Sequence, residues 1–168
     1  EVKRYENMLK TGNKQWFDSD EFLDIADYYE GNGKIKEAVK VIKLAYKTFP
    51  TNDEVTIRLS QIYSNKKMFP KAESILKEYL KKDSHNNDIY AALACLYIEN
   101  NYNEKGIKIL KNVIEKIGKD NYEDNFVNYL FIGKAYTNEK KWIVAEKYIQ
   151  TALRINNDID ALELYVLC

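Results

Sequence analysis

The stretch IKEAVKVIKLAY at residues 35–46 decides the fold, because it returns along the chain. Three other segments align with it without gaps: FPKAESILKEYL (69–80), NEKGIKILKNVI (103–114) and WIVAEKYIQTAL (142–153). A small residue marks the fourth place of each segment, namely Ala38, Ala72, Gly106 and Ala145. The first three of these residues stand 34 positions apart, and the last step is 39, an insertion of five. A fixed period of this length indicates a repeat protein.

Each repeat carries the same kinds of residue upstream of its small residue. A tyrosine stands nine positions before it every time, and apolar or small residues stand twelve and thirteen positions before it. Spacings of three, four and seven belong to helix faces, and no sustained alternation typical of strands is found. Polar or glycine-rich turns, such as those at residues 31–33 and 100–101, separate the two halves of a repeat. Each repeat is therefore predicted to be a helix A, a tight turn and a helix B.

The order aromatic, apolar–small, Tyr, small, apolar, small and Pro at this period resembles the tetratricopeptide repeat. Repeat one matches it best, with Phe22, Ile25, Ala26, Tyr29, Ala38, Ile42, Ala45 and Pro50. The other repeats depart from it in places, at Thr56, Tyr79 and Ser84, at Gly106, Val113 and Gly118, and at Asn157. The resemblance covers residues 20–157. It implies an all-α fold, a right-handed α–α superhelix or solenoid of antiparallel helix pairs.

The register divides the chain into four repeats and two outer segments. Residues 1–15 are expected to hold an N-terminal helix, either a cap or helix B of a preceding repeat. The repeats are predicted at 20–53, 54–87, 88–121 with the insertion running to 125, and 126–157, before a further helix A or capping helix at 158–168. Asp53, Asp88 and Asp158 stand where side chains cap helix N-termini. Since the chain starts without Met and ends in an apolar segment, we interpret it as a fragment whose last helix supports self-association.

Three further features carry local expectations. Trp16 and Phe17 precede the first helix A and are expected to seal the edge of repeat one, the alternative being that they form an exposed contact. The insertion near residues 118–125 should either lengthen a helix or form a loop. Gly106 stands where the other repeats have Ala, so Gly106→Ala is expected to stabilise the protein by roughly 0.5–1 kcal/mol. The alternative is that a neighbouring helix lies too close for a methyl group.

Composition narrows the classes of function. Lys and Arg together number 26, as do Asp and Glu, so the formal net charge is zero. This balance argues against nucleic-acid binding through bulk positive charge and against a polybasic membrane anchor. The longest apolar run, at residues 90–98, is too short to span a bilayer, so no membrane insertion is expected. Cys95 and Cys168 make no disulfide framework, which favours a reducing compartment such as the cytoplasm.

The sequence contains no catalytic or phosphate-binding motif. His85 is the single His and lies in a predicted loop, whereas a His/Cys metal site needs several ligands at suitable spacing. Cys95 is expected to be a small buried hydrophobe. The acid pair Asp18 and Asp20 is better explained by a helix start than by acid–base catalysis. The chain is therefore predicted to be no enzyme and to bind neither metal nor cofactor.

The resemblance also implies a binding surface. In tetratricopeptide repeats, one face of helix A lines a concave groove and contacts extended peptides or helices of partners. Here that face is acidic in its first half and more apolar in its second, which favours a peptide with basic and aliphatic residues. Its residues are Asp20, Leu23, Asp27, Glu30, Glu54, Ile57, Gln61, Asp88, Ala91, Cys95, Leu130 and Lys134, with Ser64, Ile98, Val127 and Thr137 beside them. The alternative is an ordinary solvated helix face.

Chaperone adaptors of this family hold a C-terminal carboxylate in a clamp of Lys, Asn and Arg. The corresponding positions are Leu23, Asp27, Arg58, Asp88 and Ala92, and only Arg58 is basic, so binding to chaperone C-terminal tails is not expected. The sequence thus predicts a non-catalytic scaffold that binds a protein or peptide in the groove. Two alternatives are a structural or self-assembling repeat segment and the regulatory part of a larger multidomain protein.

Overall fold

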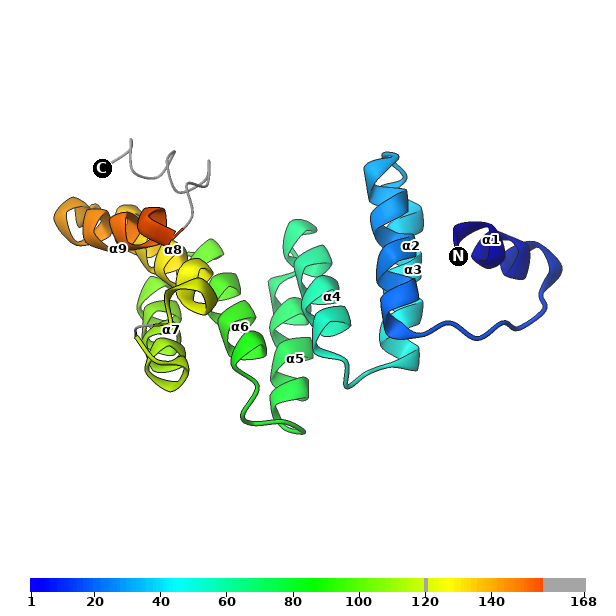
Figure 1. Ribbon diagram of the computed structural model, residues 1–168, viewed down its shortest axis with the longest axis horizontal. Helices are drawn as coiled ribbons and strands as arrows, with labels where there is room; N and C mark the ends of the chain where they lie inside the picture. Colours follow the sequence, from blue (N-terminus) through cyan, green and yellow to red (C-terminus); the bar gives the residue numbers. More distant parts are fainter. Residues whose placement is uncertain (120, 156–168) are drawn as a thin grey trace. The chain divides into compact units, whose positions relative to one another are not determined.

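The computed structural model describes residues 1–119 and 121–155, and within these ranges the chain forms nine α-helices and no strand. The helices are α1 (Val2–Thr11), α2 (Ser19–Gly31), α3 (Ile35–Thr48), α4 (Asp53–Asn65), α5 (Phe69–Leu80), α6 (Asn87–Glu99), α7 (Asn103–Ile117), α8 (Tyr122–Asn138) and α9 (Trp142–Ile155) (Figure 1). The predicted all-α helical repeat is confirmed. The expected helix at 158–168 lies outside the described residues.

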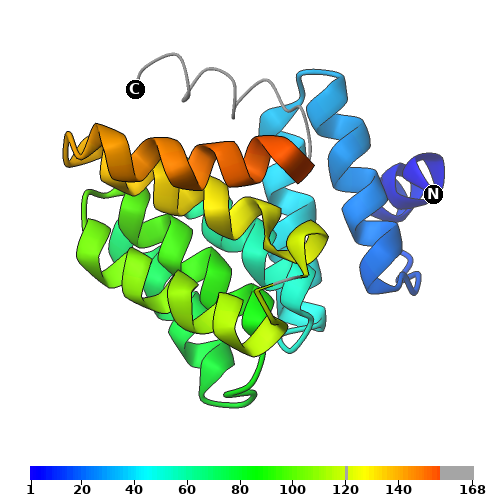
Figure 2. The ribbon, with the colours of Figure 1, turned by 60° about the vertical axis from the view of Figure 1, so that its left-hand side comes forward.

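The chain divides into two compact units that are each built from helix pairs. The first unit, Glu1–Lys82, contains α1 to α5, in which α2 packs against α3, α3 against α4 and α4 against α5. The second unit begins at Asp83, and in it α6 pairs with α7 and α8 with α9. Figure 2 shows α9 (orange) lying along α8 (yellow). Three-residue turns, at 32–34, 66–68, 100–102 and 139–141, join the helices of each pair, so the partners run antiparallel.

The residues that recur in every repeat are the ones that the fold buries. Fully buried positions of the first core include Ile25, Ala26, Ala38, Ile42 and Ala45. Fully buried positions of the second unit include Ala94, Leu110, Ile132, Ala145 and Ile149. Burying a large aliphatic side chain contributes about 1.5–3 kcal/mol, while the alanines allow the helices of a pair to approach closely. The repeat columns therefore specify the two cores.

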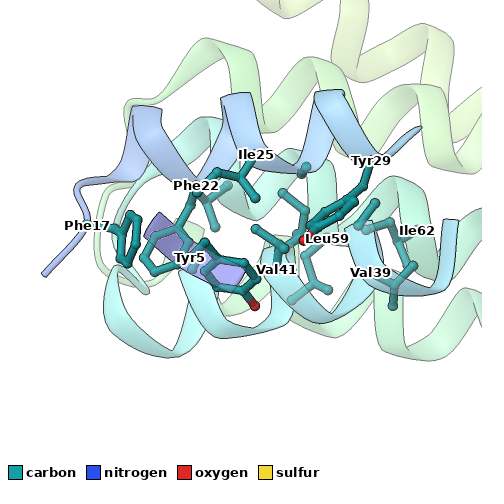
Figure 3. Close-up of a cluster of buried hydrophobic side chains, with 14 residues drawn as sticks. Tyr5, Phe17, Phe22, Ile25, Tyr29, Val39, Val41, Leu59 and Ile62 are labelled. Carbon is teal, nitrogen blue, oxygen red and sulfur yellow. The ribbon is translucent and has the colours of Figure 1, made fainter. Parts of the chain in front are cut away.

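The N-terminal segment closes one end of the first core. Tyr5 of α1 packs edge-on against Phe17 and Phe22, with ring centroids 5.9 and 6.4 Å apart. Figure 3 shows these three rings together at one end of the buried cluster. Phe17 is 2% exposed, whereas Trp16 is 73% exposed. The expectation that both residues seal repeat one is thus right for Phe17 and wrong for Trp16, because neighbouring side chains of this non-helical segment point in different directions.

The acid pair near the start of α2 marks a helix start, as the sequence predicts. The carboxylate of Asp18 accepts a hydrogen bond from the backbone N–H of Glu21 at 2.8 Å. The carboxylate of Glu21 accepts one from the backbone N–H of Asp18 at 3.1 Å, which completes a capping box. Two otherwise unpaired N–H groups of the helix end are satisfied in this way.

The caps of α4 and α6 differ from the predicted ones. Asn52 and Asn86 cap these helices, each accepting from the backbone N–H three residues further on at 2.9 Å. The prediction of Asp53 and Asp88 as caps is therefore wrong by one and two residues. Both carboxylates lie inside the first turn, where they face the positive end of the helix dipole. The third predicted cap, Asp158, lies outside the described residues.

The five inserted residues lengthen two helices. α8 has 17 residues, whereas the other A helices, α2, α4 and α6, have 13 each, and α7 has 15, whereas the other B helices, α3, α5 and α9, have 14, 12 and 14. The amide nitrogen of Asn125, which is fully buried, donates to the backbone carbonyls of Gly118 and Asn121 at 2.8 Å each. This pair of hydrogen bonds ties the short connection to the first turn of α8.

Gly106 lies where α7 closely approaches α6. A Cβ atom added to Gly106 would overlap Cγ1 of Ile98 and lie 2.8 Å from the carbonyl oxygen of Ala94. Ile98 is fully buried and the Ala94 oxygen belongs to the backbone, so neither atom can yield without a shift of the packed core. The geometry contradicts the expectation that Gly106→Ala stabilises the protein and supports the alternative of a close helix approach.

Candidate functional site

In the first unit, the predicted binding face lies on α2 and α4. These helices bury their other faces, through Phe22, Ile25, Ala26 and Tyr29 on α2 and Val55, Thr56, Leu59 and Ser60 on α4. The candidate residues remain accessible: Asp20, Asp27, Glu54 and Gln61 are exposed, and Leu23, Glu30 and Ile57 are half-buried. The strip is thus a surface that combines carboxylates with partly covered aliphatic side chains.

An ion-pair cluster joins the two helices across this strip. Nη2 of Arg58 on α4 donates to Oδ1 of Asp27 and to Oε2 of Glu30 on α2, each at 2.6 Å. The Asp27 side chain remains 66% exposed, compared with 33% for Glu30 and 32% for Arg58. One guanidinium between two carboxylates leaves a net negative charge, so the predicted acidity of this half is reduced but persists. Sequence reasoning identified the three residues separately and missed their pairing.

The predicted face of the second unit lies on α6 and α8 and is more apolar. Asp88 is exposed, and Ala91, Cys95, Leu130 and Lys134 are half-buried. Val127 is 49% exposed, and Thr137 is half-buried. Ile98, which the sequence predicts beside this face, is fully buried in the second core, where it fills the space above Gly106. Each unit therefore carries its own part of the predicted surface.

The thiol of Cys95 is held in its unreactive form. Burial, together with the nearby carboxylate of Glu99, raises its pKa to about 12 against the opposing effect of the ammonium group of Lys134. A thiol with so high a pKa stays protonated at neutral pH, whereas the thiolate is the nucleophile and metal ligand. This result agrees with the interpretation of Cys95 as a small hydrophobe.

A lysine lies over the ring of each repeat tyrosine, which the sequence reasoning also missed. The distances from Nζ to the ring centroid are 5.9 Å for Lys34 on Tyr29, 5.8 Å for Lys43 on Tyr63, 5.7 Å for Lys105 on Tyr97 and 5.8 Å for Lys111 on Tyr136. Lys43 and Lys111 each stand five positions after the small residue of one repeat and reach the tyrosine of the next. Such cation–π contacts contribute about 0.5–1 kcal/mol at exposed sites, so these lysines have a structural role.

The second unit also contains a cavity of about 390 Å³. Its lining consists of Tyr90, Ile109, Asn112, Val113, Glu115 and Lys116 and includes no Ser, Cys or His. Across the part of the chain that the structure describes, no group of three or more His, Cys, Asp and Glu residues is arranged to hold a metal ion. None of the described helices combines the length and the apolar character needed to cross a membrane.

Residues 30–94 match the model of the tetratricopeptide repeat family. This match confirms, for these residues, the resemblance seen in the repeat register, and paired helices of the same kind continue on both sides of them. The tetratricopeptide fold is in general a protein-interaction scaffold, which implies protein partners, and the family is typically non-catalytic.

Solved structures share the fold at low sequence identity. A thermophilic tetratricopeptide repeat protein of Thermus thermophilus has a TM-score of 0.72 at 17% identity, covering 88% of this chain and 81% of that one. PilF of Pseudomonas aeruginosa has a TM-score of 0.68 at 16% identity, with 89% and 74% covered. MamA of Desulfovibrio magneticus has a TM-score of 0.62 at 13% identity, with 88% and 81% covered. No curated protein sequence matches the chain.

Proposed function

We propose that this protein is a non-catalytic scaffold that binds a peptide or protein segment on the accessible faces of its A helices. One observation carries the proposal. Equivalent positions of the A helices stay accessible in both units, although each of these helices buries its other faces in a core. A surface kept open at the same place in successive repeats is available for an elongated partner.

The chemistry of the first face indicates the kind of segment that it accepts. The face carries one guanidinium, that of Arg58, and four carboxylates, those of Asp20, Asp27, Glu30 and Glu54, so its formal charge is −3. The exposed carboxylates can accept charge-assisted hydrogen bonds from a Lys or Arg of the partner. Half-buried Leu23 and Ile57 can cover an aliphatic side chain, which contributes about 25 cal/mol per Å² of apolar surface buried. The preferred segment is therefore basic and aliphatic.

The second face adds an apolar requirement. Ala91 and Leu130 are half-buried, and the nearby ammonium group of Lys134 makes this face less acidic than the first. A partner segment that meets this face should present small or aliphatic residues rather than a row of positive charges. Selection of a mixed basic and aliphatic sequence, rather than of positive charge alone, is the feature that distinguishes this site from a solvated acidic surface.

An array of random dodecapeptides tests the proposal. The wild-type protein is expected to select peptides that combine Lys or Arg with Leu or Ile. The variant Glu54→Lys/Gln61→Lys makes the formal charge of the first face more positive by three at two exposed positions, and it is expected to lose this selection while keeping the fold. The control Glu37→Lys/Thr48→Lys makes the same charge change at exposed positions of α3 and should retain it. Equal losses in both variants, or no preference in the wild type, would overturn the proposal.

A further inference from the structure

The net charge of zero conceals a separation of charge within the first repeat. Residues 18–33 contain six Asp and Glu residues and no Lys or Arg, whereas residues 34–47 contain five Lys residues and one Glu. These two stretches form α2 and α3, which pack against each other. The pair therefore exposes one acidic helix and one basic helix. Surfaces of a single sign attract complementary surfaces over distances well beyond contact.

Four of the lysines form one row along α3. Lys36, Lys40, Lys43 and Lys47 are all exposed and follow one another at spacings of 4, 3 and 4 residues, which keeps them on one helix face. At 1.5 Å per residue, the row is about 16 Å long. Within the described residues no ion pair joins any of them to a carboxylate, although Nζ of Lys43 lies 5.8 Å from the centroid of the Tyr63 ring.

A row of carboxylates with the same spacing lies on α2. Asp20, Asp24 and Asp27 are exposed and stand 4 and 3 residues apart. Asp27 pairs with Arg58 through one oxygen but keeps 66% of its side chain exposed. The N-terminal helix contacts α2 at another position, where Arg4 pairs with Glu21, so this contact leaves the row accessible. The first repeat thus carries two open rows of opposite charge and matching period.

We infer that the acidic row of α2 in one copy docks on the lysine row of α3 in a second copy of this chain. The lysine spacing of 4, 3 and 4 residues is the same from either end of the row. An antiparallel approach therefore aligns Asp20, Asp24 and Asp27 with Lys47, Lys43 and Lys40, in that order. This direction also places opposite ends of the two helix dipoles side by side, which favours it over the parallel one. Because two different surfaces meet, the contact is heterologous and can extend into a row of copies or close into a ring.

The arrangement of charge favours a second copy over a nucleic acid. A polyanion attracted to the lysine row would be repelled by the acidic helix beside it and would bring no cation to the exposed aspartates. A second copy satisfies both rows, and the zero net charge removes overall repulsion between identical molecules. The inference goes beyond peptide binding: the acidic row shares Asp20 and Asp27 with the proposed peptide-binding face, but the contact uses neither Leu23 nor Ile57 and can form without a bound peptide.

Charge-swap variants of the full chain test this contact by sedimentation. The wild type, at about 0.5 mM, is expected to associate at about 10 mM salt and to be monomeric at about 1 M, where the screening length falls from about 30 to about 3 Å. Lys40→Glu/Lys47→Glu reduces the net charge of the lysine row from +4 to zero, and Asp20→Lys/Asp24→Lys changes that of the aspartate row from −3 to +1. Each variant alone should associate at least about tenfold more weakly than the wild type. In an equimolar mixture of the two, the intact aspartate row of the first variant can dock on the intact lysine row of the second, so association should return as pairs of unlike copies.

The control variant Lys10→Glu/Lys14→Glu makes the same change in net charge as Lys40→Glu/Lys47→Glu at exposed positions outside both rows, and it should associate like the wild type. A wild type that is monomeric at low salt, a control that loses association, or a mixture that stays monomeric would each overturn the inference. Association that is insensitive to salt and to both swaps would overturn it too, because the contact would then be apolar. A third outcome would assign the lysine row to nucleic acid instead. In it, the wild type binds a labelled oligonucleotide, Lys40→Glu/Lys47→Glu does not, and the mixture of variants shows no association.

Discussion

The substitution Gly106→Ala tests how closely α6 and α7 approach each other. The added methyl group would overlap Cγ1 of Ile98, and it would lie 2.8 Å from the Ala94 carbonyl oxygen and 2.9 Å from Cδ1 of Ile98. All three atoms belong to α6. The equivalent residues Ala38, Ala72 and Ala145 are fully buried with their methyl groups, so the third repeat packs its helices more closely at this place than its siblings do.

Two opposing terms set the size of the effect. Alanine in a helix interior is favoured over glycine by roughly 0.5–1 kcal/mol. Forcing a methyl group into a filled core costs about 1–3 kcal/mol, since the helices must separate or Ile98 must leave its rotamer. The overpacking term is the larger, so we expect a net destabilisation of about 1 kcal/mol. In a chain of this size, such a change lowers Tm by about 2–4 °C.

Urea and thermal denaturation followed by circular dichroism would measure this change. Gly31→Ala is the matched control, because an atom added at Gly31 in the last turn of α2 meets nothing within 4 Å. The control should be neutral or more stable by up to about 1 kcal/mol. In an Ile98→Ala background, Gly106→Ala should cost less, because the main obstructing side chain is gone. If Gly106→Ala stabilised the protein as much as Gly31→Ala does, the conclusion that α6 lies too close to residue 106 for a methyl group would be refuted.

In urea denaturation, Phe17→Ala should destabilise the protein by about 3–5 kcal/mol and Trp16→Ala by less than about 0.5 kcal/mol, because only Phe17 is buried. Similar losses of stability in the two variants would contradict this expectation. Asn52→Ala should cost about 1 kcal/mol through loss of the α4 cap, whereas Asn52→Asp should retain stability in the same assay. In a Cys168→Ser background, the reaction of Cys95 with a thiol reagent should be slow and still accelerate through about pH 10, because the raised pKa of about 12 keeps the thiol protonated; a plateau near pH 9 would contradict it.

The repeat register predicts the all-α fold and the positions that form the cores, because both follow from local periodicity. Small residues such as Ala26 and Ala38 recur at fixed spacing, and helix geometry places them on the packing face of every repeat. The accessible candidate positions can also be predicted, because they are the helix A positions that the repeat pattern does not assign to a packed face. The matched lysine and aspartate rows are visible in the same register, because both depend on the spacing of residues along single helices.

Which side chains meet across helices was decided only by the tertiary structure. The pairing of Arg58 with Asp27 and Glu30 depends on the distance between α2 and α4, and the inward turn of Phe17 rather than Trp16 depends on the path of a non-helical segment. Whether Gly106 can be replaced by Ala depends on a few tenths of an ångström in the separation of α6 and α7. A repeat pattern predicts which helix faces are apolar. The interaction between two atoms, however, changes from attraction to repulsion over less than an ångström, so close contacts are determined only by how the helices pack together.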